Sequence, residues 1–167
     1  NSVAAATAKA VSAAIGASII RDKITLTVTT AGARSDEVLT FGANVADAET
    51  LEVGGVVYTW KTVVADPATE IQNGADAEGS IDNLVAFLNA SSNDAFAEKD
   101  TAAIAHIYAR TAGTAGDALT LVSSDANVVA GGAVLSGGVD QVWSYASEKM
   151  PFLTGLTVTS GVAFAAP

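Results

Sequence analysis

The ten residues "LEVGGVVYTW", from Leu51 to Trp60, constrain the fold most strongly, because two glycines separate two runs of strand-forming residues. Glycine adopts the positive φ angles that a two-residue hairpin turn requires, so the pattern predicts a turn at Gly54-Gly55. A phosphate-binding loop would need a helix directly after the glycines, and a β-rich run follows instead. In such a hairpin Leu51 lies opposite Tyr58 and Val53 opposite Val56, so one face carries Leu51, Val53, Val56, Tyr58 and Trp60. The other face carries Glu52, Val57 and Thr59.

The composition predicts one domain with a core of small side chains. The chain has 167 residues, of which 50% are hydrophobic, and this suffices for one core of ordinary size. The apolar content is largely Ala and Val, and only 6% of the residues are aromatic. Small side chains give a core of low volume for the length of the chain, and this favours burial of some apolar surface against other subunits. An Ala-rich composition without such contacts is the alternative.

Charge and residue types exclude several classes of function. The formal net charge is −10, and the chain has no Cys and a single His, His106. An acidic chain without clustered Lys and Arg is not expected to recognise nucleic acid directly. Without Cys there is no disulfide and no thiolate zinc site, and a single His excludes a metal site built on several His side chains.

The charge is distributed unevenly along the chain. Residues 1–35 carry four basic residues against one acid, a net charge of +3, whereas residues 36–100 carry thirteen acids against two lysines, a net charge of −11. In a repeating assembly, patches of opposite sign favour head-to-tail contact between neighbouring copies. A solvated acidic face with a few separate basic residues is the alternative interpretation.

Residues 1–22 are predicted to be an extended arm or a weak helix. Val11, Ile15 and Ile19 recur at four-residue spacing, as on one stripe of a helix. The same residues suit an arm that becomes ordered only against a partner. The segment lacks the positively charged start of a secretory signal, and no run in the chain reaches the roughly eighteen apolar residues of a membrane span. Neither a signal peptide nor a membrane partner is predicted.

Residues 23–141 are predicted to form the core domain. The alternation in "KITLTVTT" predicts a half-buried strand with Ile24, Leu26 and Val28 on one face. Residues 31–37 are predicted to be a turn before the short strand "VLTF". The stretch 63–79 is predicted to be a loop, since Pro67 and Gly74 interrupt it.

One amphipathic helix follows that loop. Its apolar residues recur at i, i+3, i+4 and i+7, which is the spacing of a helix with one buried face. Asp76 or Ser80 is suited to cap its start, and it is expected to end between residues 89 and 93. The residues on its buried face are Ile81, Leu84, Val85 and Leu88.

Beyond the helix the pattern returns to strands. In "TAAIAHIYART" one side is predicted to be buried (Ala105, Ile107 and Ala109) and the other to face outward (Ile104, His106, Tyr108 and Arg110). Short β segments follow, separated by Gly131-Gly132 and Gly137-Gly138. Residues 142–167 are predicted to be a C-terminal β extension with a hairpin at Ser160-Gly161. The fold class is therefore α+β, with one helix packed on a mainly antiparallel sheet.

Two carboxylate pairs and a set of aromatic residues are the candidates for chemistry. Asp47 with Glu49 and Asp76 with Glu78 are close in sequence, as calcium ligands or a glycosidase pair would be. Helix capping and solvated loops explain both pairs better, so a hydrolase built on Asp76 and Glu78 is a remote hypothesis. Core and interface packing is expected for the scattered aromatics Tyr58, Trp60, Tyr108, Trp143, Tyr145 and Phe152. No catalytic residue, cofactor or metal ligand is assigned.

Four segments resemble a module that is common in structural proteins of tailed bacteriophages. They are "LEVGGVVYTW", "IQNGADAEGSIDNLVAFLNAS", "AIAHIYARTAGTAGDALTLVSS" and "VLSGGVD", and the resemblance covers roughly residues 36–140. It is carried by turn and packing positions: Gly54, Gly55, Tyr58, Gly74, Ala75, Leu84, Asn89, Thr111, Ala112, Gly113, Gly116, Leu119 and Gly137 to Asp140. The resemblance therefore implies a fold and a virion context and transfers no catalytic residue. Trp60, Leu88, Gly137 and Gly138 are expected to serve the same turns and packing.

The resemblance implies a virion structural protein without enzymatic activity. The favoured expectation is a head decoration or cement protein, a homo-oligomer that sits on the head surface, typically as trimers, and bridges subunits of the major capsid protein. The alternative is a tail-tube or other tail protein that stacks in sixfold rings. A host-surface glycan-binding module that uses Trp60, Trp143 and Tyr145 is a more remote alternative. Contacts with neighbours are expected in the flanks, where the candidate interface residues are Val11, Ile15, Ile19, Arg21, Trp143, Tyr145 and Phe152.

Overall fold

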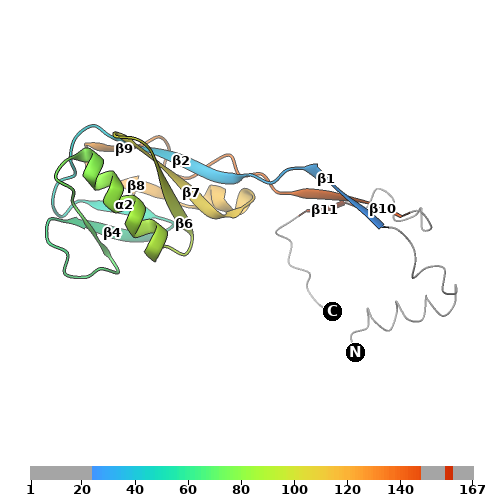
Figure 1. Cartoon of the computed structure of the whole chain (residues 1–167), viewed down its shortest axis with the longest axis horizontal. Coiled ribbons are helices and arrows are strands. Elements are labelled where there is room, and N and C mark those ends of the chain that lie inside the picture. Colours follow the sequence, from blue (N-terminus) through green and yellow to red (C-terminus); the bar gives the residue numbers. More distant parts are fainter. Residues whose placement is uncertain (1–23, 148–156, 160–167) are drawn as a thin grey trace, which may run out of the picture. The chain divides into compact units, whose positions relative to one another are not determined.

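The computed structural model describes residues 24–147 and 157–159 (Figure 1). Contacts within the chain divide these residues into two compact units. Gly32–Asp140 form the larger unit, and the other contains three strands: β1 (Ile24–Thr30), β10 (Val142–Ser147) and β11 (Thr157–Thr159). The predicted arm at residues 1–22 and the predicted hairpin at Ser160-Gly161 lie outside the described residues.

The larger unit contains two four-stranded sheets. The first has the order β6-β7-β2-β9 and is antiparallel throughout; its strands are β2 (Arg34–Phe41), β6 (Ala95–Thr101), β7 (Ile104–Ala112) and β9 (Val128–Ala130). The second has the order β5-β4-β3-β8, in which only β4 and β5 are parallel; its strands are β3 (Thr50–Val53), β4 (Val56–Lys61), β5 (Glu70–Gln72) and β8 (Leu121–Ser123). The helix α2 (Ala77–Ser91) lies beside β6 and β5, and a short 3₁₀ helix, η2 (Thr114–Ala118), precedes β8. The predicted α+β class is confirmed.

Both sheets and α2 contribute to one hydrophobic core. Phe41 of β2 meets Trp60 of β4 edge to face, with ring centroids 6.4 Å apart, so the two sheets pack directly on each other. Tyr58 of β4 packs in the same manner on Phe87 of α2, at 5.0 Å. On β6 and β7 the core contains small side chains, since Ala95, Ala97, Ala105 and Ala109 are buried. The core therefore combines large side chains, such as Trp60, with small alanines on β6 and β7 that allow close approach of neighbouring elements.

The hairpin at Gly54-Gly55 is confirmed. Both glycines have positive φ, +61° and +81°, as a two-residue turn requires. The register pairs Leu51 with Tyr58 and Val53 with Val56, as the alternation predicts. Val56 departs from the prediction of a shared buried face, because its side chain is 44% exposed at the end of the sheet.

The predicted helix is confirmed, and Asp76 is its N-cap. The Asp76 carboxylate accepts a hydrogen bond from the Gly79 N–H at 2.8 Å. Ser80, the alternative cap, is buried instead, where its hydroxyl donates to Asn44 Oδ1 and accepts from the Gly74 N–H. Three apolar residues of the predicted stripe are fully buried, Ile81, Leu84 and Leu88, whereas Val85 is only partly buried at the edge of the core.

We expect Asp76→Ala to lower the free energy of unfolding by about 1 kcal/mol, because the Gly79 N–H loses its acceptor and the negative charge leaves the helix start. Asp76→Asn is the matched control, since its side-chain oxygen still accepts that hydrogen bond. Urea unfolding followed by circular dichroism measures both variants. Equal losses for Ala and Asn would contradict the capping role.

The C-terminal end of α2 is joined to β6 and β7 by side chains. Asn89 donates to the Ala97 carbonyl and accepts from the Ala97 N–H, at 3.0 and 2.9 Å. The guanidinium of Arg110 on β7 donates to the carbonyls of Leu88, Asn89 and Ser92, which are acceptors at the end of the helix. A cation at this position also complements the negative end of the helix dipole.

Three segments differ from the prediction. Residues 95–101 form β6, a strand that the sequence pattern did not predict. The predicted turn at 31–37 is shorter, because β2 already begins at Arg34. Within the predicted loop 63–79, residues 70–72 form β5, where Ile71 is fully buried against the core.

The terminal strands form a sheet of their own, in the order β1-β10-β11. β1 is a strand as predicted, but it pairs with β10 and belongs to this unit, whereas the predicted core domain began at residue 23. The register places Val28 opposite Trp143. Val28 is 40% exposed, although a half-buried face was predicted, because within the described residues this sheet is a single layer.

Candidate interaction surface

The outer face of the β6-β7-β2 sheet carries a stack of planar side chains. Tyr108 lies between Phe96 and His106, with centroid distances of 5.1 and 5.8 Å and interplanar angles below 20°. The guanidinium of Arg34 lies over the Phe96 ring, 5.5 Å from its centroid. The strand register produces this stack, because Phe96 and Tyr108 are direct cross-strand partners.

Carboxylates surround the His106 end of the stack. The Nδ1 atom of His106 lies 3.4 Å from Asp36 Oδ2, and Nε2 lies 4.0 Å from Asp100 Oδ2. Burial raises the pKa of the Tyr108 hydroxyl, and the charges of Glu98, Asp36 and Asp100 raise it further. The outward-facing position predicted for His106 and Tyr108 is confirmed, and both side chains are partly covered by their neighbours.

The opposite end of the stack is a hollow of about 260 Å³ lined by Arg34, Phe96 and Arg110. Each arginine donates to backbone carbonyls: Arg34 Nη1 to Ala109 at 2.9 Å, and Arg110 to the end of α2. Among the described residues, neither guanidinium forms an ion pair with a carboxylate. Lys99, by contrast, binds Glu78 and Asp82 at 2.7 and 2.8 Å. The hollow thus combines two guanidinium groups with an aromatic ring in an acidic chain.

Exposed valines mark the surface of the second sheet. Val57 of β4 and Val122 of β8 flank Glu52 of β3 in register, and both valines are exposed. Val63, in the connection between β4 and β5, is 80% exposed. Single exposed valines are ordinary, but Val57 and Val122 on either side of Glu52, which we call the valine pair, are a surface suited to contact with another molecule.

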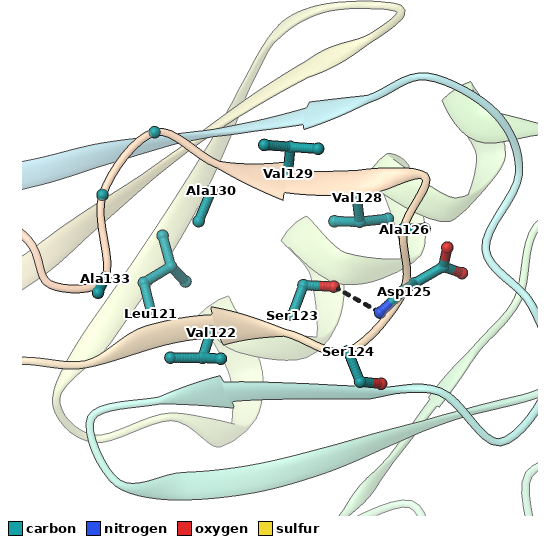
Figure 2. A pocket seen from close by; sticks show the side chains of 12 residues that line it. Leu121, Val122, Ser123, Ser124, Asp125, Ala126, Val128, Val129, Ala130 and Ala133 are labelled. Carbon is teal, nitrogen blue, oxygen red and sulfur yellow. Dashed lines mark hydrogen bonds between the residues drawn. The ribbon is translucent and has the colours of Figure 1, made fainter.

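A groove of about 500 Å³ lies between β8 and β9, the edge strands of the two sheets (Figure 2). Leu121 and Val128 form its buried floor, and Ser123 lies beside the turn that joins the strands. The buried Asp125 in that turn accepts hydrogen bonds from the N–H groups of Ala46 and Asn127, both at 2.7 Å. The polar groups of the turn are satisfied within the chain, so they serve the structure of the loop.

Two of the predicted turn and packing glycines, Gly116 and Gly138, lie where an added side chain would not fit. A Cβ on Gly116 would lie 2.5 Å from Ser35 Oγ, and one on Gly138 would lie 2.4 Å from both Ser35 Oγ and the Gly113 carbonyl oxygen. Gly113 and Gly137 have positive φ, +109° and +80°. The predicted packing residues Tyr58, Trp60, Leu84 and Leu88 are buried.

Asp117 holds this glycine-rich region together. Its carboxylate accepts from the Ser35 hydroxyl at 2.7 Å and from the Gly138 N–H at 2.9 Å. These hydrogen bonds favour the charged form and lower the pKa of Asp117 below its ordinary value of 3.8, with the Ser35 bond as the largest cause.

A lowered pKa in the folded state predicts loss of stability in acid. The stabilisation from Asp117 is complete above the unfolded-state pKa near 3.8 and is lost as the pH falls through the folded-state pKa. We expect the free energy of unfolding to decrease as the pH is lowered below about 4. Asp117→Asn should make this decrease smaller and should also lower the free energy of unfolding at pH 7. Urea titrations at several pH values measure both effects. An unchanged pH dependence in the variant would contradict this role.

The carboxylate pairs have structural roles and do not face each other across a cleft. Asp47 accepts from the Thr62 N–H at 2.6 Å, which is the main cause of its lowered pKa, and Glu49 accepts from the Ser124 hydroxyl. Asp76 caps α2, and Glu78 pairs with Lys99. Among the described residues, no group of three or more potential metal ligands occurs.

The predicted interface residues lie largely outside the described residues. This holds for Val11, Ile15, Ile19, Arg21 and Phe152. Trp143 and Tyr145 lie on β10. Trp60, proposed with them as a sugar-stacking group, is fully buried in the core and is not accessible to a glycan.

Sequence reasoning did not predict the stack and its hollow. The outward alternation of His106, Tyr108 and Arg110 was recognised, but Phe96 was not assigned to a strand. The sequence "AFAEKDT" gives no apolar-polar alternation to identify this strand, because the buried Ala95 and Ala97 flank the apolar Phe96.

No protein-family model, curated protein or solved structure matches the chain in the comparisons made. Within the part of the chain that the structure describes, no helix is long and apolar enough to span a membrane.

Proposed function

We propose that the chain is a structural protein of a tailed-bacteriophage virion, and that it works by burying surface against its neighbours without catalytic turnover. One observation carries this proposal: the residues responsible for the resemblance to the phage module occupy positions that determine the backbone. Gly54 and Gly55 form the hairpin turn, Gly74 touches the start of α2, and Gly116 and Gly138 touch Ser35. Other residues do not fit at such positions, so a resemblance there indicates that the chain and the phage module share a fold.

The surface of the chain supports this function. The valine pair on the second sheet and the hollow lined by Arg34, Phe96 and Arg110 are exposed on the same acidic chain. Aromatic residues and arginines contribute most at protein interfaces, whereas scattered acids keep the free chain soluble. Both features suit a protein that is soluble before assembly and buried after it.

Within this class we favour a head decoration protein that bridges subunits of the major capsid protein. The chain is short and acidic, and its basic first 35 residues suit contact with an acidic neighbour. A tail-tube protein in sixfold rings is the second candidate, because an acidic bore also favours passage of DNA.

Electron microscopy of the encoding phage tests the proposal. Gold-labelled antibodies against the chain should label the heads of intact particles. Labelling of the tail would move the assignment to a tail protein, and particles without label would overturn the virion role.

Imaging of the purified protein over a concentration series tests symmetry separately. Threefold particles, or monomers that do not form tubes, agree with decoration, whereas stacked sixfold rings or tubes indicate a tail tube.

A further inference from the structure

In the hollow lined by Arg34, Phe96 and Arg110, neither arginine forms an ion pair with a carboxylate of the described residues. Two guanidinium groups beside one ring favour a carboxylate. The hydrogen bonds of Arg34 to Ala109 and of Arg110 to the end of α2 use only some of their N–H groups, so both side chains retain donors for it. The Phe96 ring adds an apolar wall that suits an aliphatic side chain. The ligand that fits is therefore a protruding segment that carries both an acid and an exposed apolar residue.

The chain itself presents such a segment. The acidic loop, which we define as residues 62–70, comprises the connection from β4 to β5 and the first residue of β5. It carries Val63, the most exposed of the large hydrophobic residues that the structure describes. It also carries Asp66 and Glu70, whose pKa values are lowered chiefly by hydrogen bonds from backbone N–H groups. Both side chains therefore remain charged well into the acid range.

The acidic loop is held in shape by its own side chains. Glu70 accepts from the N–H groups of Ala65 and Asp66, at 2.6 and 2.9 Å. Asp66 accepts from the Ala68 N–H and the Thr69 hydroxyl, at 3.0 and 2.8 Å. A loop that is ordered before contact loses little conformational entropy when it binds, so its exposed residues are suited to recognition.

We propose that the hollow of one copy receives the acidic loop of a second copy, so that identical chains associate head to tail. Val63 packs against Phe96, and the loop carboxylates lie beside Arg34 and Arg110. The proposal rests on the proposed function, in that the chain works in an assembly. In head-to-tail association the hollow of each copy meets the loop of the next copy, so repetition of the contact generates a ring or a filament.

Two variants test the two sides of the contact. Arg34→Glu reverses the charge of the exposed arginine in the hollow, and Val63→Ser removes the apolar residue of the loop without removing the side chains that brace it. Val129→Ser is the matched control, because Val129 is also exposed but lies on β9, outside both patches. Circular dichroism establishes that each variant is folded.

Sedimentation velocity of the full chain over a concentration series is the measurement. We expect each test variant to weaken self-association at least tenfold and Val129→Ser to leave it unchanged. A one-to-one mixture of Arg34→Glu and Val63→Ser should form heterodimers that do not grow further, since one intact hollow then meets one intact loop. Higher salt should weaken the wild-type contact.

Three outcomes would overturn the contact. They are self-association that neither variant changes, a mixture in which association is not restored, and wild-type protein that stays monomeric throughout the series. Antibody labelling of phage particles separates these outcomes from the function. If the particles are labelled but neither variant changes self-association, the contact between the hollow and the acidic loop is wrong and the virion role still stands.

Discussion

Replacing Gly74 by alanine is expected to lower the free energy of unfolding by about 3 kcal/mol or more. A Cβ at this position would lie 2.2 Å from Ser80 N and 2.3 Å from the carbonyl carbon of Gly79. Both atoms are backbone at the start of α2, where the Asp76 cap and the hydrogen bond from Gly74 N–H to Ser80 Oγ fix them. The added methyl group therefore has to displace the helix from the loop that precedes it.

Gly42→Ala is the matched control for this substitution. The nearest atom to its added Cβ is the Asn127 carbonyl oxygen at 3.7 Å, an ordinary contact. We expect its stability to change by no more than about 1 kcal/mol. Guanidinium unfolding followed by far-ultraviolet circular dichroism measures both variants. If Gly74→Ala proves as stable as Gly42→Ala, the close approach of Gly74 to the helix is wrong.

Replacing Trp60 by alanine is expected to cost about 3–5 kcal/mol, because its fully buried ring joins the two sheets through Phe41. Trp60→Phe should cost less, because the Trp60 indole N–H has no hydrogen-bond partner among the described residues and only part of the ring volume is lost. The same guanidinium titration measures the two losses.

Val63→Ala serves as the control for the Trp60 series. Its side chain is 80% exposed, so truncation should change stability by less than about 0.5 kcal/mol. A small loss for Trp60→Ala would mean that the two sheets are not held together at this position.

The sequence was sufficient for the parts of the fold that depend on local rules. The Gly54-Gly55 turn and the apolar stripe of α2 follow from backbone conformation and from periodicity, and both were predicted with the correct residues. β5 was missed because only Ile71 of its three residues is buried, so there is no alternation to detect. β6 was missed because small Ala side chains on its inner face gave little apolar contrast.

The candidate surface was harder to predict, since it depends on strand register. Tyr108 and Arg110 were assigned to an outward face, but their stacking partners come from β6 and from the start of β2. A pattern in one segment shows which side a residue faces and not which distant residue lies beside it. That Arg34 forms no ion pair likewise becomes visible only when the described residues are assembled in space.

The two hydrogen bonds between Asn89 and Ala97 have a consequence for the behaviour of the chain during synthesis. One amide side chain occupies both the donor and the acceptor that Ala97 would otherwise offer to a strand of another chain. When many newly made copies are crowded together, this edge of β6 is blocked at Ala97 as a template for aggregation. Asn89 thereby helps to keep the protein available in soluble form.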